Sequence, residues 1–163
     1  MLGAVLLAGC LGQTPERARI DAVLVRDSGA GRVLEIEQRL GWPDAVLDAL
    51  DHGIPVRLAY PARCGGVSLG TWIEIAYAPL QRSYVLRVPG LPERRYSRRG
   101  ALLAALDRVR LPLPENLPDR CEGSLQVALD LTFLPTPLRF PALFRWDEWR
   151  MVSPPVPWQN RLD

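Results

Sequence analysis

Alternating apolar and polar residues mark several short strands along the chain. Residues 20–26 and 32–40 are the first two such segments, and the turn residues 27–31 between them predict a hairpin. In the second segment Leu34 and Ile36 alternate with glutamates, as expected for a strand with one buried face. The same alternation predicts further strands at residues 54–60, 67–77, 84–88 and 125–131, and residues 94–96 are expected to add a short strand.

Two segments follow a helical period instead. In the first, Pro43 suits the opening turn of a helix and Gly53 suits its end. Val46, Leu47 and Leu50 lie on one face between them. The second helix is predicted from Ser97 or Arg98 to Arg110, with one apolar face made of Leu102, Leu103, Leu106 and Val109.

These elements together predict one fold class. Short strands joined by short turns favour an antiparallel sheet, and the two helices are expected to cover one of its faces. Residues 111–118 contain three prolines and are predicted to be irregular. We therefore expect an α+β fold, mainly an antiparallel sheet of about six to seven strands with two helices packed on it.

The N-terminal residues look like part of an export signal. Residues 4–8 form an apolar run that is too short to span a bilayer, and residues 7–10 resemble a bacterial lipobox whose cysteine, Cys10, is a candidate for lipidation. The alternative is a buried or disordered tail. We predict a signal and short tether over residues 1–16 and one α+β domain over 17–163, in the periplasm or tethered to a membrane facing it.

Two cysteines remain beyond this segment, Cys64 and Cys121. Each lies in a turn just before a strand-like run. An even pair in an oxidising compartment is a candidate disulfide, which would stabilise the fold by about 4 kcal/mol through loop closure. The alternative is two free thiols that never meet.

The composition excludes several kinds of chemistry. All 20 basic residues are arginines, so neither a Schiff-base lysine nor a phosphate-loop lysine is available. His52 is the only histidine, which excludes a two-histidine metal site, and its place in the last turn of the first helix favours a structural role. The formal net charge of +2 is too small to indicate a nucleic-acid partner. We find no catalytic constellation and expect no metal or cofactor.

Two surface clusters are candidate binding sites. Arg94, Arg95, Tyr96, Arg98 and Arg99 form a basic patch around an aromatic ring, which suits phosphate or an acidic partner, although such runs are often only solvated turns. The second cluster places two indoles around two carboxylates, an arrangement that suits a sugar ring or a partner's arginine, although packing of the indoles in the core is the simpler interpretation. Its residues are Trp146, Asp147, Glu148 and Trp149.

The proline-rich segment 153–158 is expected to be extended and to form a strap over the sheet.

An ordered set of short motifs resembles a known family. The carrying residues are 49–50, 53–56, Trp72, 77–84, 104–106, 134–138, Trp149 and Ser153, which span most of residues 45–158. In this order they resemble the exported proteobacterial "proline-rich signal peptide" family, catalogued as domain of unknown function DUF4390. The resemblance implies export and a shared fold, and it implies no catalytic residues. Genes of this family often lie near that of an envelope sensor kinase, which suggests an accessory role in envelope sensing.

Three functional hypotheses follow, in order of preference. The first is a non-catalytic binding or accessory module that contacts another envelope protein, with a sensor kinase as one candidate. The second is an enzyme or binder acting on cell-wall glycans through the tryptophan–acid cluster, with Asp130, Asp147 or Glu148 as its carboxylates. The third, a nucleic-acid binder using the arginine patch, conflicts with export.

Overall fold

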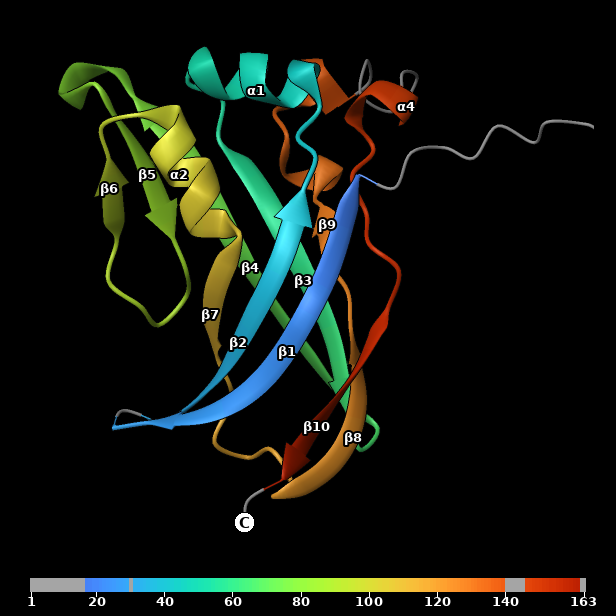
Figure 1. Cartoon of the computed structure of the whole chain (residues 1–163). Helices are drawn as coiled ribbons and strands as arrows, with labels where there is room; N and C mark the ends of the chain where they lie inside the picture. The colour runs from blue at the N-terminus through green and yellow to red at the C-terminus, as the bar shows by residue number, and fades with distance from the viewer. Residues whose placement is uncertain (1–16, 30, 140–145, 162–163) are drawn as a thin grey trace, which may run out of the picture.

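The computed structural model describes residues 17–29, 31–139 and 146–161, and only the backbone of Trp146 and Arg161. Within these residues the chain forms two sheets in which every strand pairing is antiparallel (Figure 1), and this confirms the expected α+β class. The ten strands exceed the six or seven expected. They are β1 (Ala18–Ser28), β2 (Gly31–Leu40), β3 (Val56–Cys64), β4 (Val67–Ala78), β5 (Ser83–Arg87), β6 (Arg94–Tyr96), β7 (Arg108–Pro112), β8 (Arg120–Leu125), β9 (Ala128–Leu129) and β10 (Val156–Arg161).

The two sheets form two layers with one core between them. The smaller sheet has the order β1-β2-β7, and the larger has the order β10-β8-β3-β4-β5-β6, with β9 also paired to β3. The strands of the smaller sheet cross in front of the larger sheet in Figure 1, and β1 lies beside β10. On the side away from β1 and β10, no described strand connects β7 of the smaller sheet with β4 of the larger sheet, so the two sheets are not joined there.

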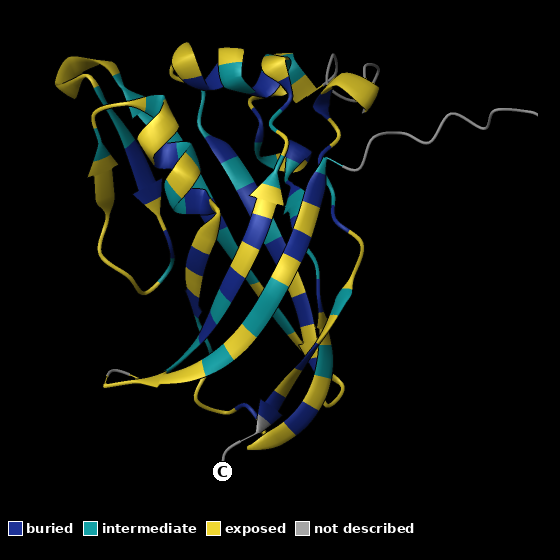
Figure 2. Ribbon diagram, in the orientation of Figure 1, coloured by how far each residue is buried: buried dark blue, intermediate teal, exposed yellow. Residues whose placement is uncertain are grey.

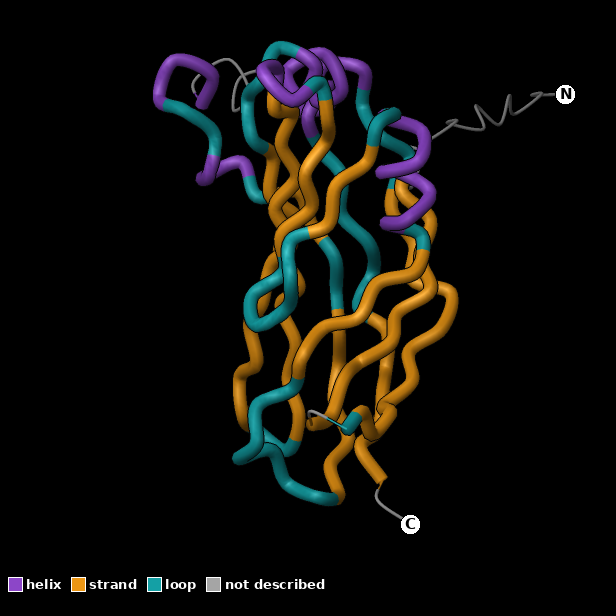
Figure 3. The backbone as a smooth tube through the Cα atoms, turned by 90° about the vertical axis from the view of Figure 1, so that its left-hand side faces the viewer, coloured by secondary structure: helices purple, strands orange, loops and turns teal. Residues whose placement is uncertain are grey.

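The helices are short and lie toward one end of the molecule (Figure 3). Although we expected both on one face of a sheet, α1 (Asp44–Asp51) lies across the end of the layers beside α4 (Trp146–Trp149). There α1 closes the core by burying Val46, Ala49 and Leu50. In contrast, α2 (Arg99–Leu106) packs beside β5, β6 and β7. Two single 3-10 turns are also present, η1 (Pro79–Gln81) and η2 (Leu131–Phe133).

The core follows the alternation seen in the sequence, as the alternating bands of Figure 2 show. Leu34 and Ile36 of β2 face Leu58 of β3 and Ile73 and Ile75 of β4 across one continuous apolar interior. Each such side chain contributes about 1.5–3 kcal/mol when fully buried.

One polar side chain lies deep in this core. Gln38 donates from Nε2 to the Tyr60 hydroxyl at 2.8 Å and to the Leu106 carbonyl at 2.7 Å. Burial raises the pKa of Tyr60 far above its ordinary value, so its hydroxyl stays protonated.

The second predicted helix is too long. It ends at Leu106, and β7 begins two residues later, pairing Val109 with Ile36 and Leu111 with Leu34 of β2. Val109 fits the helical face by spacing, but residues 108–111 also alternate between arginine and apolar residues. Residues 108–111 form a strand because pairing with β2 buries the side chains of both Val109 and Leu111.

The predicted late strand is interrupted. Its apolar residues are buried as expected, but the chain forms β8 up to Leu125, then β9, then η2. Beyond β8 the neighbour changes on one side only: Gln126 still donates to Pro61 of β3 at 3.1 Å, whereas Leu129 donates to Met151 at 2.8 Å. The break therefore lies where residues 151–153 replace β10 as the neighbour on that side.

The C-terminal strap lies at a sheet edge and not over a face. Residues 156–161 form β10, which pairs with β8 from Val156 opposite Leu125 to Arg161 opposite Arg120. Pro157 is compatible with this position because an edge strand bonds on one side only.

Cys64 and Cys121 are joined in a disulfide, with Cα atoms 5.5 Å apart. The bond ties the end of β3 to the start of β8. The lipidation candidate Cys10 lies outside the described residues.

Candidate functional site

A groove of about 470 Å³ lies along the open side between the two sheets. One wall is formed by residues 67–71 of β4, and the other by residues 111–114, which end β7 and continue just beyond it. Its floor is the core itself, where Leu34, Tyr60 and Leu125 are almost completely buried. Pockets of this size and apolar character are typical of binding sites.

A single turn opens this groove by ending β5 early. Leu91 donates to the Val88 carbonyl at 3.1 Å, Pro89 takes the first central position, and Gly90 has φ of 79°. These are the residues and geometry of a type II turn. As a result β5 pairs only with the last five residues of β4, from Glu74 on, and no described strand pairs with the earlier half of β4 on that side.

The hydrogen-bond register shows which backbone groups of β4 are free. Arg57 and Pro61 of β3 accept from Asp130 and Gln126, on the side of β3 away from β4. Strand residues bond alternately to either side, so Leu58, Tyr60 and Ala62 of β3 bond to β4. Their partners in the register are Ile73, Thr71 and Leu69.

The remaining alternate residues of β4, Ser68, Gly70 and Trp72, therefore direct their N–H and C=O groups toward the open edge. No backbone bond to that edge exists among the described residues.

This edge has none of the features that usually protect a sheet edge from other chains. Residues 67–72 contain no charge and no proline, although charged side chains, prolines and bulges are the common safeguards. Val67 is 39% exposed, and a side chain at Gly70 would have open space around it. The edge is therefore both accessible and chemically suited to pairing.

A basic hollow of about 420 Å³ lies just beyond the turn that ends β5. It is lined by Arg94 of β6, by Arg108 and Arg110 of β7, and by Val88 and Leu91 from the turn itself. Glutamates of β2 pair with Arg108 at 2.6 Å and with Arg110 at 2.8 Å. Arg94 has no ion pair among the described residues, so the hollow retains positive charge.

The structure separates the predicted arginine patch into different settings. Arg95 pairs with Glu93 at 2.7 Å, and Arg99 pairs with Asp51. Tyr96 packs against the core, and Arg98 is exposed. Only Arg94 reaches the basic hollow, so the predicted patch is not one site.

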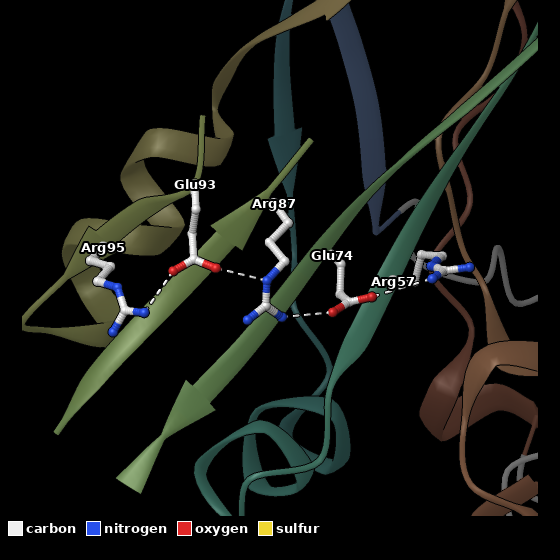
Figure 4. Close-up of polar contacts among 5 residues, drawn as sticks. All are labelled: Arg57, Glu74, Arg87, Glu93 and Arg95. Atoms are coloured by element: carbon white, nitrogen blue, oxygen red, sulfur yellow. Dashed lines mark hydrogen bonds and ion pairs between the residues drawn. The ribbon is translucent and has the colours of Figure 1, made fainter. Parts of the chain in front are cut away.

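Arg95 instead ends a chain of ion pairs on the outer face of the larger sheet (Figure 4). Glu93 joins it to Arg87 at 2.9 Å, and Glu74 joins Arg87 to Arg57 at 2.9 and 3.2 Å. The hydrogen bond from Arg87 lowers the pKa of Glu93, and Glu93 and Glu74 raise the pKa of Arg87. The two glutamates offset two of the three arginine charges, and each charged group of the chain has at least one partner of opposite sign.

The far end of this chain is an arginine held between two rings. The Arg57 guanidinium lies 4.2 Å from the centroid of Trp72 and 3.7 Å from that of Phe133. Contacts of this kind are favourable cation–π interactions. They fasten η2 to the sheet, which is a structural role that the sequence patterns did not indicate.

The tryptophan–acid cluster is only partly a surface feature. Trp149 is 7% exposed, which leaves little of its indole for a sugar ring, while Asp147 and Glu148 are exposed on α4. The backbone carbonyls of both acids accept from Arg17, at 2.9 and 3.4 Å. The side chain of Trp146 lies outside the described residues.

Asp130 does not join these carboxylates. Its side chain accepts from the backbone and hydroxyl of Thr132, at 3.0 and 2.5 Å, and caps η2. Trp149 and Glu148 line a separate hollow of about 340 Å³ with His52 of the α1 end. There the Asp48 carbonyl, 2.7 Å from Nδ1, is the main reason that the pKa of His52 is raised.

The groove itself was missed by reasoning from the sequence. The sequence contains one indication of the groove: a long predicted strand, residues 67–77, is followed by a short one that Pro89 and Gly90 interrupt. That mismatch in length implies an unpaired edge, but the sequence alone does not show that β7 forms the opposite wall.

Comparisons with models of protein families, with curated proteins and with solved structures found no match. Among the described residues, no helix is long and apolar enough to cross a membrane. The same residues contain no group of three or more histidine, cysteine or acidic side chains placed to hold a metal ion.

Proposed function

We propose that this chain is an exported, non-catalytic binding module that captures part of another envelope protein in the groove between its two sheets. The observation that carries the proposal is the groove itself, which places an unpaired strand edge beside an apolar floor made of core residues. Such an arrangement suits recognition, because it offers buried apolar area and backbone hydrogen bonds at one place.

The disulfide supports the location that we propose. Bonds of this kind persist in oxidising compartments such as the bacterial periplasm and are rare in the cytosol. Cys64 and Cys121 are 0% and 9% exposed, so neither serves as an accessible reactive thiol. Attachment to a membrane through Cys10 belongs to the same proposal.

The alternative hypothesis of a glycan-acting protein has less support. It needs indole faces and carboxylates in one open cleft. Trp149 is buried, and Asp130 is occupied as a helix cap. The basic hollow is suited to an anionic group, but its positive charge is confined to a small area and does not indicate an extended nucleic-acid-binding surface.

Site-specific photo-crosslinking in the bacterium of origin tests this function. The chain, with its native upstream region, carries a photoreactive phenylalanine analogue in place of Leu69 or Leu113, which line the groove, or of Arg19, which is exposed on β1 as the control. We expect the same envelope protein to be crosslinked from both groove positions and not from Arg19.

Mass spectrometry of the purified chain completes the test. A chain that begins at an acylated Cys10, with Cys64 and Cys121 unreactive until reduced, is expected. Equal crosslinking from all three positions, or recovery of the chain from the cytosol with free thiols, would contradict the proposal.

A further inference from the structure

We infer that the partner enters the groove as one extended peptide segment that adds to β4 as a new strand, with alternate apolar side chains on the core floor and an acidic end near the basic hollow. This inference rests on the proposed function and specifies the chemistry of its partner. No residue of the described chain supplies such a strand.

The free backbone of β4 favours a peptide over other apolar ligands. Ser68, Gly70 and Trp72 present three N–H and three C=O groups to the groove edge, as the register requires. An alkyl chain would cover these groups without bonding them, at a cost of about 1–3 kcal/mol for each buried group. An extended peptide satisfies them in the same way as a neighbouring strand.

The walls of the groove favour a single segment over a second copy of this domain. Residues 67–71 stand on one side and residues 111–114 on the other, and Gly90 would contact Pro112 at 3.6 Å if it carried a side chain. A whole sheet brought up to β4 would meet β7 and this turn. One strand, about 4.8 Å from β4, fills the space between them.

The pattern of the partner follows from the pleat. In an added strand every second side chain points toward the core, where Leu34, Tyr60 and Leu125 form the floor, and the others point to solvent. The unpaired part of β4, residues 67–73, sets the length at about seven residues.

The end of the segment that reaches the turn at Pro89 meets Arg94, Arg108 and Arg110. An aspartate or glutamate there complements the arginines.

Selection from random twelve-residue peptides displayed on phage tests the inference with the full-length oxidised protein. Phage are selected on the wild-type chain alone, and the enriched peptides are then compared on Ser68→Pro, which removes one edge N–H. We expect enriched peptides that alternate apolar residues and carry an acidic end. Their synthetic forms are expected to bind Ser68→Pro at least about tenfold more weakly, which corresponds to about 1.4 kcal/mol.

The matched control is Gln159→Pro, another proline on an edge strand. Pro157 already occupies the alternate position of β10, so this change removes an N–H from the same side of that strand. It is expected to leave peptide affinity unchanged within about twofold. Arg94→Glu is expected to weaken peptides with an acidic end, and Arg98→Glu, an exposed charge outside the groove, is not.

A change made in the peptide removes any dependence on how the variants fold. N-methylation of the alternate peptide amides that face β4 blocks strand pairing and is expected to abolish binding. N-methylation of the other alternate amides, which face away from β4, is not expected to abolish binding. Hydrogen exchange at Ser68, Gly70 and Trp72 is expected to slow when the unmodified peptide binds.

Several results would overturn the inference. These are enrichment of no peptide, equal affinity of selected peptides for wild type and Ser68→Pro, or equal tolerance of both methylation patterns. Co-purification of an acyl lipid that protects the groove, a dimer that Ser68→Pro dissociates, or slow exchange at all three amides in the monomer alone would identify another occupant. If groove crosslinking to an envelope protein persists in Ser68→Pro, the proposed function stands and strand addition fails.

Discussion

Arg57 makes both ring contacts and an ion pair at the middle of the larger sheet. Its guanidinium is stacked between the rings of Trp72 and Phe133, it pairs with Glu74, and its strand lies in the middle of the larger sheet. Arg63, on the same strand and the same face, is exposed and makes no ion pair among the described residues. The two positions therefore separate the effect of the rings from the effect of charge.

We expect Arg57→Ala to lower the free energy of unfolding by about 1–2 kcal/mol, because each ring contact contributes roughly 0.5–1 kcal/mol and Glu74 keeps Arg87 as a partner. Arg57→Lys should recover only part of this loss, since an ammonium group lacks the planar surface that stacks. Arg63→Ala is expected to change stability by less than about 0.5 kcal/mol. Urea unfolding of the three variants is the measurement, and equal losses for Arg57→Ala and Arg63→Ala would refute the assignment.

Individual strands were the easiest elements to predict from the sequence, and their ends were the hardest. The β1–β2 hairpin, β3, β4 and β6 follow from alternation and turn residues. Alternation could not show that residues 108–112 leave the helix, because Val109 suits a helical face as well as a strand face. The choice depends on β2, which is about 75 residues away in sequence.

The candidate site was less accessible to sequence reasoning than the fold. The binding candidates chosen beforehand were charged or aromatic, and several of them have structural roles: Arg95 and Arg99 pair with Glu93 and Asp51, and Trp149 packs in the core. The groove is built from ordinary apolar residues of distant segments, so no local motif marks it. What marks it is a missing strand partner, and this can be seen only once the sheet order is known.

β4 is expected to show an alternating pattern of hydrogen exchange in the free protein. Leu69 and Thr71 bond to β3 and should exchange slowly, whereas Ser68 and Gly70 face the open edge and should exchange faster. In the half of β4 that pairs with β5, from Glu74 on, both sets should be protected. Amide exchange followed by NMR measures this directly, and uniform protection along β4 would show that the edge is covered.

The disulfide connects the groove to the stability of the whole molecule. Cys64 immediately precedes the turn of Gly65 and Gly66 that begins β4, and both glycines have positive φ, of 55° and 82°. Cys121 lies in β8, on the other side of β3. The bond therefore holds the start of the groove wall to the opposite half of the sheet.

Replacing both cysteines by alanine is expected to lower the free energy of unfolding by about 4 kcal/mol, because the bond closes a loop with a sequence separation of 57 residues. The same loss is expected when the wild-type chain unfolds in a strong reductant. Urea unfolding with and without reductant compares the two, and the double variant should be insensitive to the reductant. A loss below about 1 kcal/mol in both cases would show that packing alone holds β3 and β8 together.

The position of β1 beside β10 has a consequence for how the molecule is made. The neighbours that complete the two layers come from opposite ends of the described chain, and β2–β7 and β3–β8 are also distant pairings. A nascent chain can form the β1–β2 and β3–β4 hairpins early, but it cannot complete its core until β10 has been synthesised. Assembly dominated by such distant pairings is slow. Slow assembly suits the export that we propose, because a translocase threads unfolded chains, and the covalent link between Cys64 and Cys121 would then form after both residues have crossed.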